Sequence, residues 1–546
     1  MHALSRTRLA LRSCFPRTNT RTKYSSAAPP RPPVPPPSLG GAARGGGTIV
    51  SDKLARGASG TVDVTSKTTA AAGRMKEGAA PEEAQPSRPP PEELLTVLQE
   101  TIKTHGPLPI SRYMTLCLSH PTLGYYTTRK VFGKEGDFVT SPEISQVFGE
   151  LLAIWFVTQW LAQGSPHHVR LVEFGPGRGT LLADILRTFR SLPAHSRPPI
   201  SSIHLVETSP LLRSVQKSAI TQVGHVDTPT HWYGDVKEVP QAKSGPEGEM
   251  TMLVAHEFFD ALPIHVFEHT QKGWREVLVD VSDPKTITTP STPSLRLVLA
   301  PSPTPASAMY SMMGQLASSS GVAQQPDLLS ASPAAKKAPS PLNVDTTLGT
   351  SAASSPAPPP PTPSSSASGA HSLTAQRFAR LPLGSRIEVS PASWEIARDV
   401  AQLIGEKGAG LVVDYGDAKA FGRSWRGFRK HQVVDPLSEP GHTDLTANVD
   451  FSYLAEAMSD FATTHGPIPQ SRFLTSLGLQ PRLASLLRNA PTEERRKEIE
   501  SAAKRLVDVG VEGMGGQYRV MGVTPKKGKG QGEGMEAEEV FPFDLK

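Results

Sequence analysis

The chain has 546 residues and a formal net charge of +6, and its 53 prolines and 46 glycines gather in stretches that cannot bury a core. Residues 1–51 contain eight Arg and Lys and no acid, so the remaining residues have a net charge of −2. A part of the chain that is close to neutral does not attract nucleic acid. Because there are only two cysteines, Cys14 and Cys117, and no apolar run approaches the roughly 20 residues that span a bilayer, we expect no metal site and no transmembrane segment.

The N-terminal residues 1–25 are rich in arginine, contain Ser and Thr and lack acids, with leucines spaced between them. This composition is typical of a mitochondrial transit peptide, although a merely basic tail would share it. Residues 26–92 are rich in Pro, Ala and Gly and are predicted to be a disordered linker. Folded structure is predicted to begin near Glu93, where acids precede an apolar run with helical spacing.

Strands and helices are then predicted to alternate. Before a second low-complexity stretch the predicted elements are, in order, a strand Val169–Phe174, a helix Leu181–Phe189, a strand Ile203–Val206, a helix Leu211–Ile220 and a strand Met252–Ala255. Residues 283–370 are predicted to be a disordered insertion, after which a helix from Ser390 to Ile404 and a buried strand Leu411–Val413 follow. This alternation predicts one α/β domain in two parts, 93–282 and 371–522, with a mostly parallel sheet. Residues 523–546 are predicted to be a disordered charged tail.

Three glycines, Gly175, Gly177 and Gly179, follow the first strong strand, and Glu173 comes just before them. Glycines let the backbone approach a ligand closely at the carboxyl edge of a sheet. Dinucleotide-binding proteins need the longer spacing G-x-G-x-x-G, so a nicotinamide oxidoreductase is disfavoured. An ordinary glycine turn between a strand and a helix remains the alternative.

Two further acids follow the next strands. Glu207 lies at the tip of the second strand, where a carboxylate can hold a ribose diol by two hydrogen bonds, although an acid at a strand end is commonly just solvated. Asp235 follows a short Trp-Tyr segment, in the position where an adenine edge would lie. Together with the glycine motif, these acids predict a site for a nucleoside-containing cofactor.

His256, Glu257 and Asp260 follow the strand Met252–Ala255, and two phenylalanines separate the acids. Guanidinium stays charged and planar, and carboxylates bind it in a bidentate manner. The pattern therefore favours a cationic acceptor beside the cofactor. Packed phenylalanines with a helix-capping Asp260 are the alternative.

Several long motifs occur together, at residues 136–150, 172–181, 256–263, 412–416 and 440–451. Their sequence resembles the MidA-like family of mitochondrial complex I assembly-factor arginine methyltransferases. The resemblance implies a class I (Rossmann-like) methyltransferase fold with an extra N-terminal helical segment, and S-adenosyl-L-methionine as cofactor. His256 stands where many bacterial members carry Asn, and the insertion 283–370 is not part of the family pattern.

The resemblance also implies an activity. It implies symmetric (type II) dimethylation of an arginine in the complex I matrix-arm subunit that borders the quinone site, needed for assembly or stability of the complex, and a location in the mitochondrial matrix. It places Thr140 and Ser141 in a segment that closes over the cofactor. From the residues alone, Ser141 and Pro142 also suit the N-cap and first position of a helix.

Other interpretations stay open. Asp414 and Asp444 are acids near the ligand edge of the sheet, or else strand-end and turn residues. A non-catalytic assembly scaffold with this fold and a methyltransferase for small molecules are the alternative functions. The sequence specifies no oligomeric state.

Overall fold

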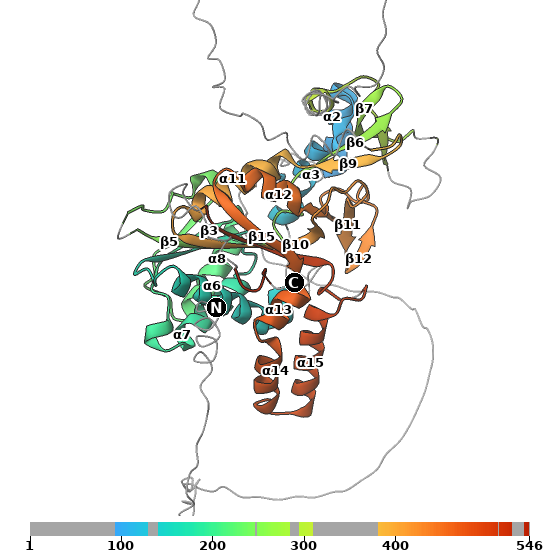
Figure 1. Ribbon diagram of the computed structural model, residues 1–546. Coiled ribbons are helices and arrows are strands. Elements are labelled where there is room, and N and C mark those ends of the chain that lie inside the picture. Colours follow the sequence, from blue (N-terminus) through green and yellow to red (C-terminus); the bar gives the residue numbers. More distant parts are fainter. Residues whose placement is uncertain are drawn as a thin grey trace, which may run out of the picture. The chain divides into compact units, whose positions relative to one another are not determined.

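A computed structural model describes residues 93–128, 140–245, 248–283, 285, 294–309, 381–511, 513–526 and 540–544 (Figure 1). The predicted transit peptide, the predicted linker 26–92 and most of the predicted insertion 283–370 lie outside these residues. In the part of the chain that the structure describes, no helix is long and apolar enough to cross a membrane.

The core of the fold is a mostly parallel sheet, as predicted. Its strands pair in the order β15-β16-β10-β5-β2-β3-β4, with β14 on β10. All neighbours from β10 to β4 are parallel, whereas β16 runs antiparallel to both of its neighbours. The bounds are β2 Val169–Phe174, β3 Ile200–Val206, β4 Thr230–Tyr233, β5 Met250–His256, β10 Gly408–Asp417, β14 Val449–Asp450, β15 Ala462–Pro469 and β16 Tyr518–Pro525.

Helices cover both faces of this sheet, because its central strands are apolar on both sides (Figure 1). Leu171 and Leu411 pack with α6, α7 and α13, whereas their neighbours Val172 and Val412 pack with α11 and α12. The helices are α6 Gln146–Ala162, α7 Thr180–Ser191, α8 Pro210–Gln222, α11 Pro391–Ile404, α12 Phe451–Met458, α13 Gln470–Ser476, α14 Leu479–Arg488 and α15 Glu493–Val507, with short turns η1 Ala194–Ser196 and η2 Val236–Glu238.

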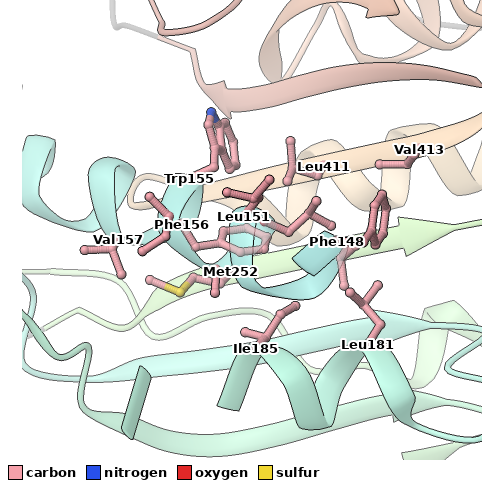
Figure 2. Packing of buried hydrophobic residues seen from close by; sticks show 14 of the residues in the cluster. Phe148, Leu151, Trp155, Phe156, Val157, Leu181, Ile185, Met252, Leu411 and Val413 are labelled. Carbon is pink, nitrogen blue, oxygen red and sulfur yellow. The ribbon is translucent and has the colours of Figure 1, made fainter. Parts of the chain in front are cut away.

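Helix α6 is apolar around its whole circumference and is accordingly buried. Figure 2 shows Phe148 of this helix beside the strand residue Val413 and the α7 residue Leu181, and Leu151 beside the strand residue Leu411. The helix thereby joins the sheet to α7, which begins directly after the glycine motif. Burial of this kind stabilises by roughly 1.5–3 kcal/mol per large apolar side chain and fixes where the glycine turn lies.

An accessory part surrounds the N-terminal helices. Leu98, Tyr113 and Val279 share an apolar cluster with Leu445, so α2, α3, β7 and β13 pack together. The extra N-terminal helical segment was predicted, but the two small antiparallel sheets beside it were not. The accessory helices are α2 Leu94–His105, α3 Ile110–Ser119 and α4 Tyr125–Thr128, and the strands of the two sheets are β1 Leu108–Pro109, β6 His265–Thr270, β7 Gly273–Val281, β8 Leu295–Leu299, β9 Arg386–Val389, β11 Arg426–Arg429, β12 Gln432–Val434 and β13 Asp444–Thr446. The short helix α5 Ser141–Ile144 packs against α6 and α7.

Two segments expected to be disordered contain paired or packed structure. Strand β8 lies within the predicted insertion and pairs with β7, because apolar residues from Leu295 to Leu299 can join an open sheet edge. Within the predicted tail, β16 extends to Pro525, and residues 540–544 pack back on the core. There Trp155 donates its indole N–H to the carbonyl of Phe541 at 3.0 Å. Polar composition nearby obscured these short apolar runs.

Candidate cofactor and acceptor site

A cavity of about 490 Å³ lies at the carboxyl ends of β2 and β5. From β2 the chain continues to β3 on one side, and later adds β5 on the other, so the strand order reverses there. Such a reversal leaves a crevice beyond the strand ends in which ligands bind. The segments after both strands line the cavity, together with residues from α3, α4, α5, β11 and β13.

The backbone conformation at the three positions of the glycine motif favours glycine. The φ angles are +61° at Gly175, +51° at Gly177 and +79° at Gly179, all in the left-handed region that L-residues rarely adopt. A Cβ on Gly175 would also lie 3.1 Å from the ring of Phe258, and one on Gly179 would lie 3.3 Å from Cα of Gln216. The turn is therefore a close-packed floor for the cavity.

Glu173 is the last residue but one of β2, directly before this turn, and lines the cavity. Its side chain is only 2% exposed, and burial raises its pKa to about 8. Among the described residues its buried Oε2 has no hydrogen-bond partner. A buried oxygen without a partner fits a ligand that brings a cation or a donor to this point.

Glu207 lies at the tip of β3 and is held by a small network. The backbone N–H of Ser209 donates to its Oε1 at 2.8 Å, and Nε2 of Gln216 donates to its Oε2 at 3.1 Å. Gln216 also donates to the carbonyl of Gly177 at 2.7 Å and accepts from the indole N–H of Trp232 at 2.9 Å. One buried amide therefore joins the glycine turn to the second-strand acid.

Two of the three remaining residues predicted to bind the cofactor also line the cavity. They are Thr140 and Asp235. Ser141 does not line it: its side chain is fully buried, with Oγ 3.8 Å from the sulfur of Met514, and its N–H donates to the carboxylate of Glu257. The predicted helix start is displaced by one residue, because Thr140 rather than Ser141 is the N-cap of α5.

Glu257 follows β5 with a φ of +49°, which is unusual for a residue with a Cβ. The hydroxyl of Tyr518 donates to its Oε1 at 2.8 Å. Burial, with a smaller contribution from Asp260, raises the pKa of Glu257 to about 8. The carboxyl is thus buried in the cavity wall in a fixed position, where a cation would favour its ionised form.

Asp414 holds the turn that carries Asp260. Its Oδ2 accepts the N–H groups of Phe258, Phe259 and Asp260 at 3.2, 2.9 and 3.3 Å. Asp414 is fully buried within β10 and does not line the cavity, so it shapes the turn rather than binding a ligand. Asp260 does line the cavity, and burial raises its pKa to about 6 while nearby Arg426 opposes that rise.

His256 also lines the cavity, but its ring is neutral because burial lowers its pKa to about 3. The ring stacks on Tyr518 with centroids 6.3 Å apart and contacts Phe148 at 5.0 Å. Nε2 lies 3.5 Å from Oε1 of Glu257, which for a neutral ring is no ion pair. His256 therefore contributes shape rather than charge.

Sequence reasoning missed three residues of the site: Gln216, Tyr518 and Tyr126. Gln216 is one polar residue in an amphipathic helix, and Tyr518 is one aromatic in a strand, so neither has a local pattern that distinguishes it. Tyr126 comes from the accessory helix α4 and donates to Asp444 at 2.8 Å. Only the fold brings Tyr126 to the cavity, and Gln216 and Tyr518 to the acids Glu207 and Glu257 that line it.

Comparison with known proteins agrees with this geometry. Residues 151–468 match a family model described as "Putative S-adenosyl-L-methionine-dependent methyltransferase". A crystal structure of a protein from Burkholderia thailandensis bound to S-adenosyl-homocysteine superposes with a TM-score of 0.55 at 22% identity, covering 79% of this chain and 91% of that one. The fold and the family match define the class, an S-adenosylmethionine-dependent methyltransferase.

Two relatives narrow the identification. The Mus musculus and Homo sapiens proteins named "Protein arginine methyltransferase NDUFAF7, mitochondrial" are each 34% identical to the chain. These alignments cover 74% and 76% of this chain and 79% and 80% of the relatives. The chain belongs to the family of S-adenosylmethionine-dependent methyltransferases that includes these NDUFAF7 proteins, and S-adenosylmethionine is its cofactor.

The residues at the glycine end of the cavity fit this cofactor. The glycine turn leaves no side chain over the floor, the buried oxygen of Glu173 lacks a partner, and Glu207 is a fixed carboxylate at the second strand tip. The cofactor carries an ammonium, a sulfonium and a ribose diol, which are respectively two cationic groups and two hydroxyl donors. Carboxylates are suitable partners for all of these.

Proposed function

We propose that the chain is a protein arginine N-methyltransferase in which Glu257 and Asp260 bind the acceptor guanidinium. The observation that supports this most directly is the charge of the cavity wall. Among the described residues that line it, seven are Asp or Glu and one, Arg178, is an arginine. The acids at the acceptor end are Glu143, Glu257, Asp260 and Asp444. A wall of this composition favours a cationic substrate over an acidic or neutral one.

The cofactor-binding roles that we propose follow the geometry of the opposite end. Glu173 binds the ammonium, the backbone of Gly175, Gly177 and Gly179 admits the amino-acid half, and Glu207 accepts from the ribose hydroxyls. Asp235 lies at the adenine edge, and Thr140 belongs to the segment that closes over the cofactor. When bound, S-adenosylmethionine supplies a methyl group on a sulfonium centre.

The chain's own residues mainly orient the acceptor. Glu257 pairs with the guanidinium, and its fixed position beside Tyr518 and the Ser141 N–H sets the plane of that group. The new N–CH₃ bond replaces the S–CH₃ bond, so the products are S-adenosylhomocysteine, methylarginine and one proton. Since a guanidinium ion is a far weaker acid than a carboxyl group, Glu257 acts by charge and position rather than as a strong base.

We further propose that the acceptor is an arginine of the complex I matrix-arm subunit that borders the quinone site, dimethylated symmetrically in the mitochondrial matrix. The names of the relatives support a mitochondrial arginine methyltransferase. The arginine-rich, acid-free residues 1–25 support import into the organelle. The particular subunit and the type of dimethylation rest on the resemblance of the sequence motifs alone.

The test uses the full chain with isotopically labelled S-adenosylmethionine and complex I subunits from cells that lack the enzyme. Mass spectrometry should find symmetric dimethylarginine after incubation with the wild type. Glu257→Gln should retain cofactor binding in calorimetry and lose turnover by roughly 100-fold or more. The exposed Glu406→Gln is the matched control and should remain active.

A separate control reports on the cofactor. Glu207→Ala should abolish saturable binding of S-adenosylmethionine, which the wild type should show. Binding by the wild type without methyl transfer to any arginine would instead favour the non-catalytic scaffold. Equal turnover by Glu257→Gln would refute the acceptor role of this carboxyl.

A further inference from the structure

A short strand of the accessory part, β13, is bonded to the turn that carries the proposed acceptor carboxylates. The backbone N–H of Ala447, directly after β13, donates to the carbonyl of Asp260 at 2.9 Å. Thr446 is the last residue of β13, comes immediately before Ala447 in the chain, and lines the cavity. This backbone bond therefore fixes Thr446 at the acceptor end, beside the turn after β5.

The side chain of Thr446 faces the cavity side of its strand. Successive side chains of a strand point to opposite faces. Leu445 packs in the apolar cluster of the accessory part, together with Leu98 and Tyr113, whereas Thr446 lines the cavity. Burial of Leu445 on one face thus determines that Thr446 lies on the other.

The hydroxyl of Thr446 is buried and has no hydrogen-bond partner among the residues that the structure describes. The residue is only 5% exposed. A polar atom that is removed from water and lacks a partner destabilises the folded protein, and a valine of similar shape would avoid that cost. The hydroxyl is therefore better explained by a ligand that completes its hydrogen bond than by the stability of the free protein.

The cation that faces this strand has partners of its own. Arg426 lies directly opposite Thr446 in the pairing of β11 with β13. It donates to Oδ1 of Asn448 at 2.7 Å and to the carbonyl of Ser424 at 2.9 Å, and it does not line the cavity. Because the Thr446 hydroxyl is neutral, it forms no ion pair with this arginine, and its oxygen can accept from a ligand.

We propose that Oγ1 of Thr446 accepts a hydrogen bond from the guanidinium of the acceptor arginine. A guanidinium has five N–H donors and no acceptor, and in a site that excludes water each of these donors needs an oxygen. Glu257 and Asp260 supply charged oxygens in the proposed function, and Thr446 adds a neutral one from the side of β13. Thr446 is thus a binding residue for the acceptor, and this inference rests on the proposed arginine acceptor.

Binding of small probes tests the assignment without turnover. The full chain, saturated with S-adenosylhomocysteine, is titrated with propylguanidinium, which is the arginine side chain without its backbone, and with N-acetyl-L-arginine amide. Thr446→Val should weaken the binding of both probes by the same factor, roughly three- to tenfold. A loss for the arginine amide alone would place the hydroxyl on the peptide backbone of the substrate and overturn the assignment.

The stability of the ligand-free chain separates a ligand-binding role from a structural one. Because the hydroxyl lacks a partner in the protein, Thr446→Val should keep or raise the midpoint of thermal unfolding. A hydroxyl that holds the fold together would make the same variant less stable. A lowered midpoint would therefore overturn the assignment even if the variant bound the probes more weakly.

Two further variants serve as controls. Thr463→Val makes the same substitution in strand β15, at an exposed residue that does not line the cavity, and it should bind both probes and unfold like the wild type. Thr446→Ser keeps the hydroxyl and removes the methyl group, so it should recover probe affinity relative to Thr446→Val. Equal weakening by the serine and valine variants would assign the effect to packing and refute the hydrogen bond.

The failure of this inference differs from the failure of the proposed function. Probe binding that is weakened by Glu257→Gln but not by Thr446→Val would overturn the role of Thr446 and leave the proposed function intact. Probe binding that depends on Thr446, without methylation of any protein arginine, would contradict the proposed function and leave the binding site. No binding of either probe by the wild type would count against both.

Discussion

The hydroxyl of Tyr518 lies 2.8 Å from Oε1 of Glu257, so the last strand of the central sheet touches the first residue after β5. This bond lowers the pKa of Glu257 against the larger effect of burial, which raises it. Tyr518→Phe should therefore raise that pKa further. We expect kcat/KM for the acceptor to fall roughly tenfold at pH 7 and to recover at higher pH. A uniform loss at every pH would show that Tyr518 acts only through packing.

The wild type should show a related pH dependence. Glu257 must be ionised to pair with a guanidinium, and its pKa in the ligand-free protein is raised to about 8. Because the ionised fraction increases as pH rises through this value, kcat/KM for the acceptor should increase from pH 6 through about pH 8 and level off above about pH 9. Rates at subsaturating acceptor give the profile. A flat profile between pH 6 and 9 would contradict the role of Glu257.

Gln216 should control cofactor affinity, because its amide bonds both the Gly177 carbonyl and the Glu207 carboxylate. Gln216→Glu places a second carboxyl against both acceptors, so the dissociation constant for S-adenosylmethionine should rise roughly tenfold or more at pH 8. At pH 6, protonation of one of the two carboxyls restores a donor, and part of the affinity should return. Calorimetry at both pH values measures this.

Gln222→Glu is the control for that experiment, since Gln222 lies on the same helix α8 but is exposed. Its affinity should match the wild type at both pH values. If Gln216→Glu lost affinity without any dependence on pH, the bond to Glu207 would not be the cause.

The packed C-terminal residues should contribute to stability. Phe543 contacts Phe473 and Trp155, with ring centroids 5.8 and 6.3 Å apart, and fills the space over Gly522. Phe543→Ala should lower the free energy of unfolding by about 2–4 kcal/mol, as for other large-to-small changes. Val511→Ala, at a residue that is 94% exposed, should leave it within about 0.5 kcal/mol. Chemical denaturation of both variants tests this, and equal midpoints would contradict the packing.

Much of the central fold was predictable because its residues have strong local patterns. Strand Val169–Phe174 has the predicted bounds, and α11 begins after Ser390, whose hydroxyl accepts from the N–H of Ser393. The glycine turn and the acids at the ends of β2, β3 and β5 could be placed at one edge because parallel strands end there together. Continuous apolar runs and helix caps involve residues that are close together in the chain, so they can be recognised from a single sequence.

The accessory part could not be predicted in the same way. Strand β13 is only three residues long, and β9 pairs with β6 across more than a hundred residues of chain. Neither has a pattern that specifies its partner. Asp414 and Asp444 have similar sequence contexts. In the fold Asp414 binds the backbone of the turn after β5, whereas Asp444 lines the cavity, because burial and strand pairing decide which way each side chain faces.

The order of the strands in the central sheet determines when the acceptor end is completed during synthesis and folding. Strand β10 lies between β5 and β16, and the hydroxyl of Tyr518 in β16 donates to Glu257. The acceptor end is therefore incomplete until almost the last part of the chain has been synthesised. Long-range pairings of this kind form late in folding. A truncated or partly threaded polypeptide could hold the glycine turn and still lack a finished acceptor end. With the acceptor role that we propose for Glu257, we therefore expect a copy of the chain that lacks β16 to be inactive.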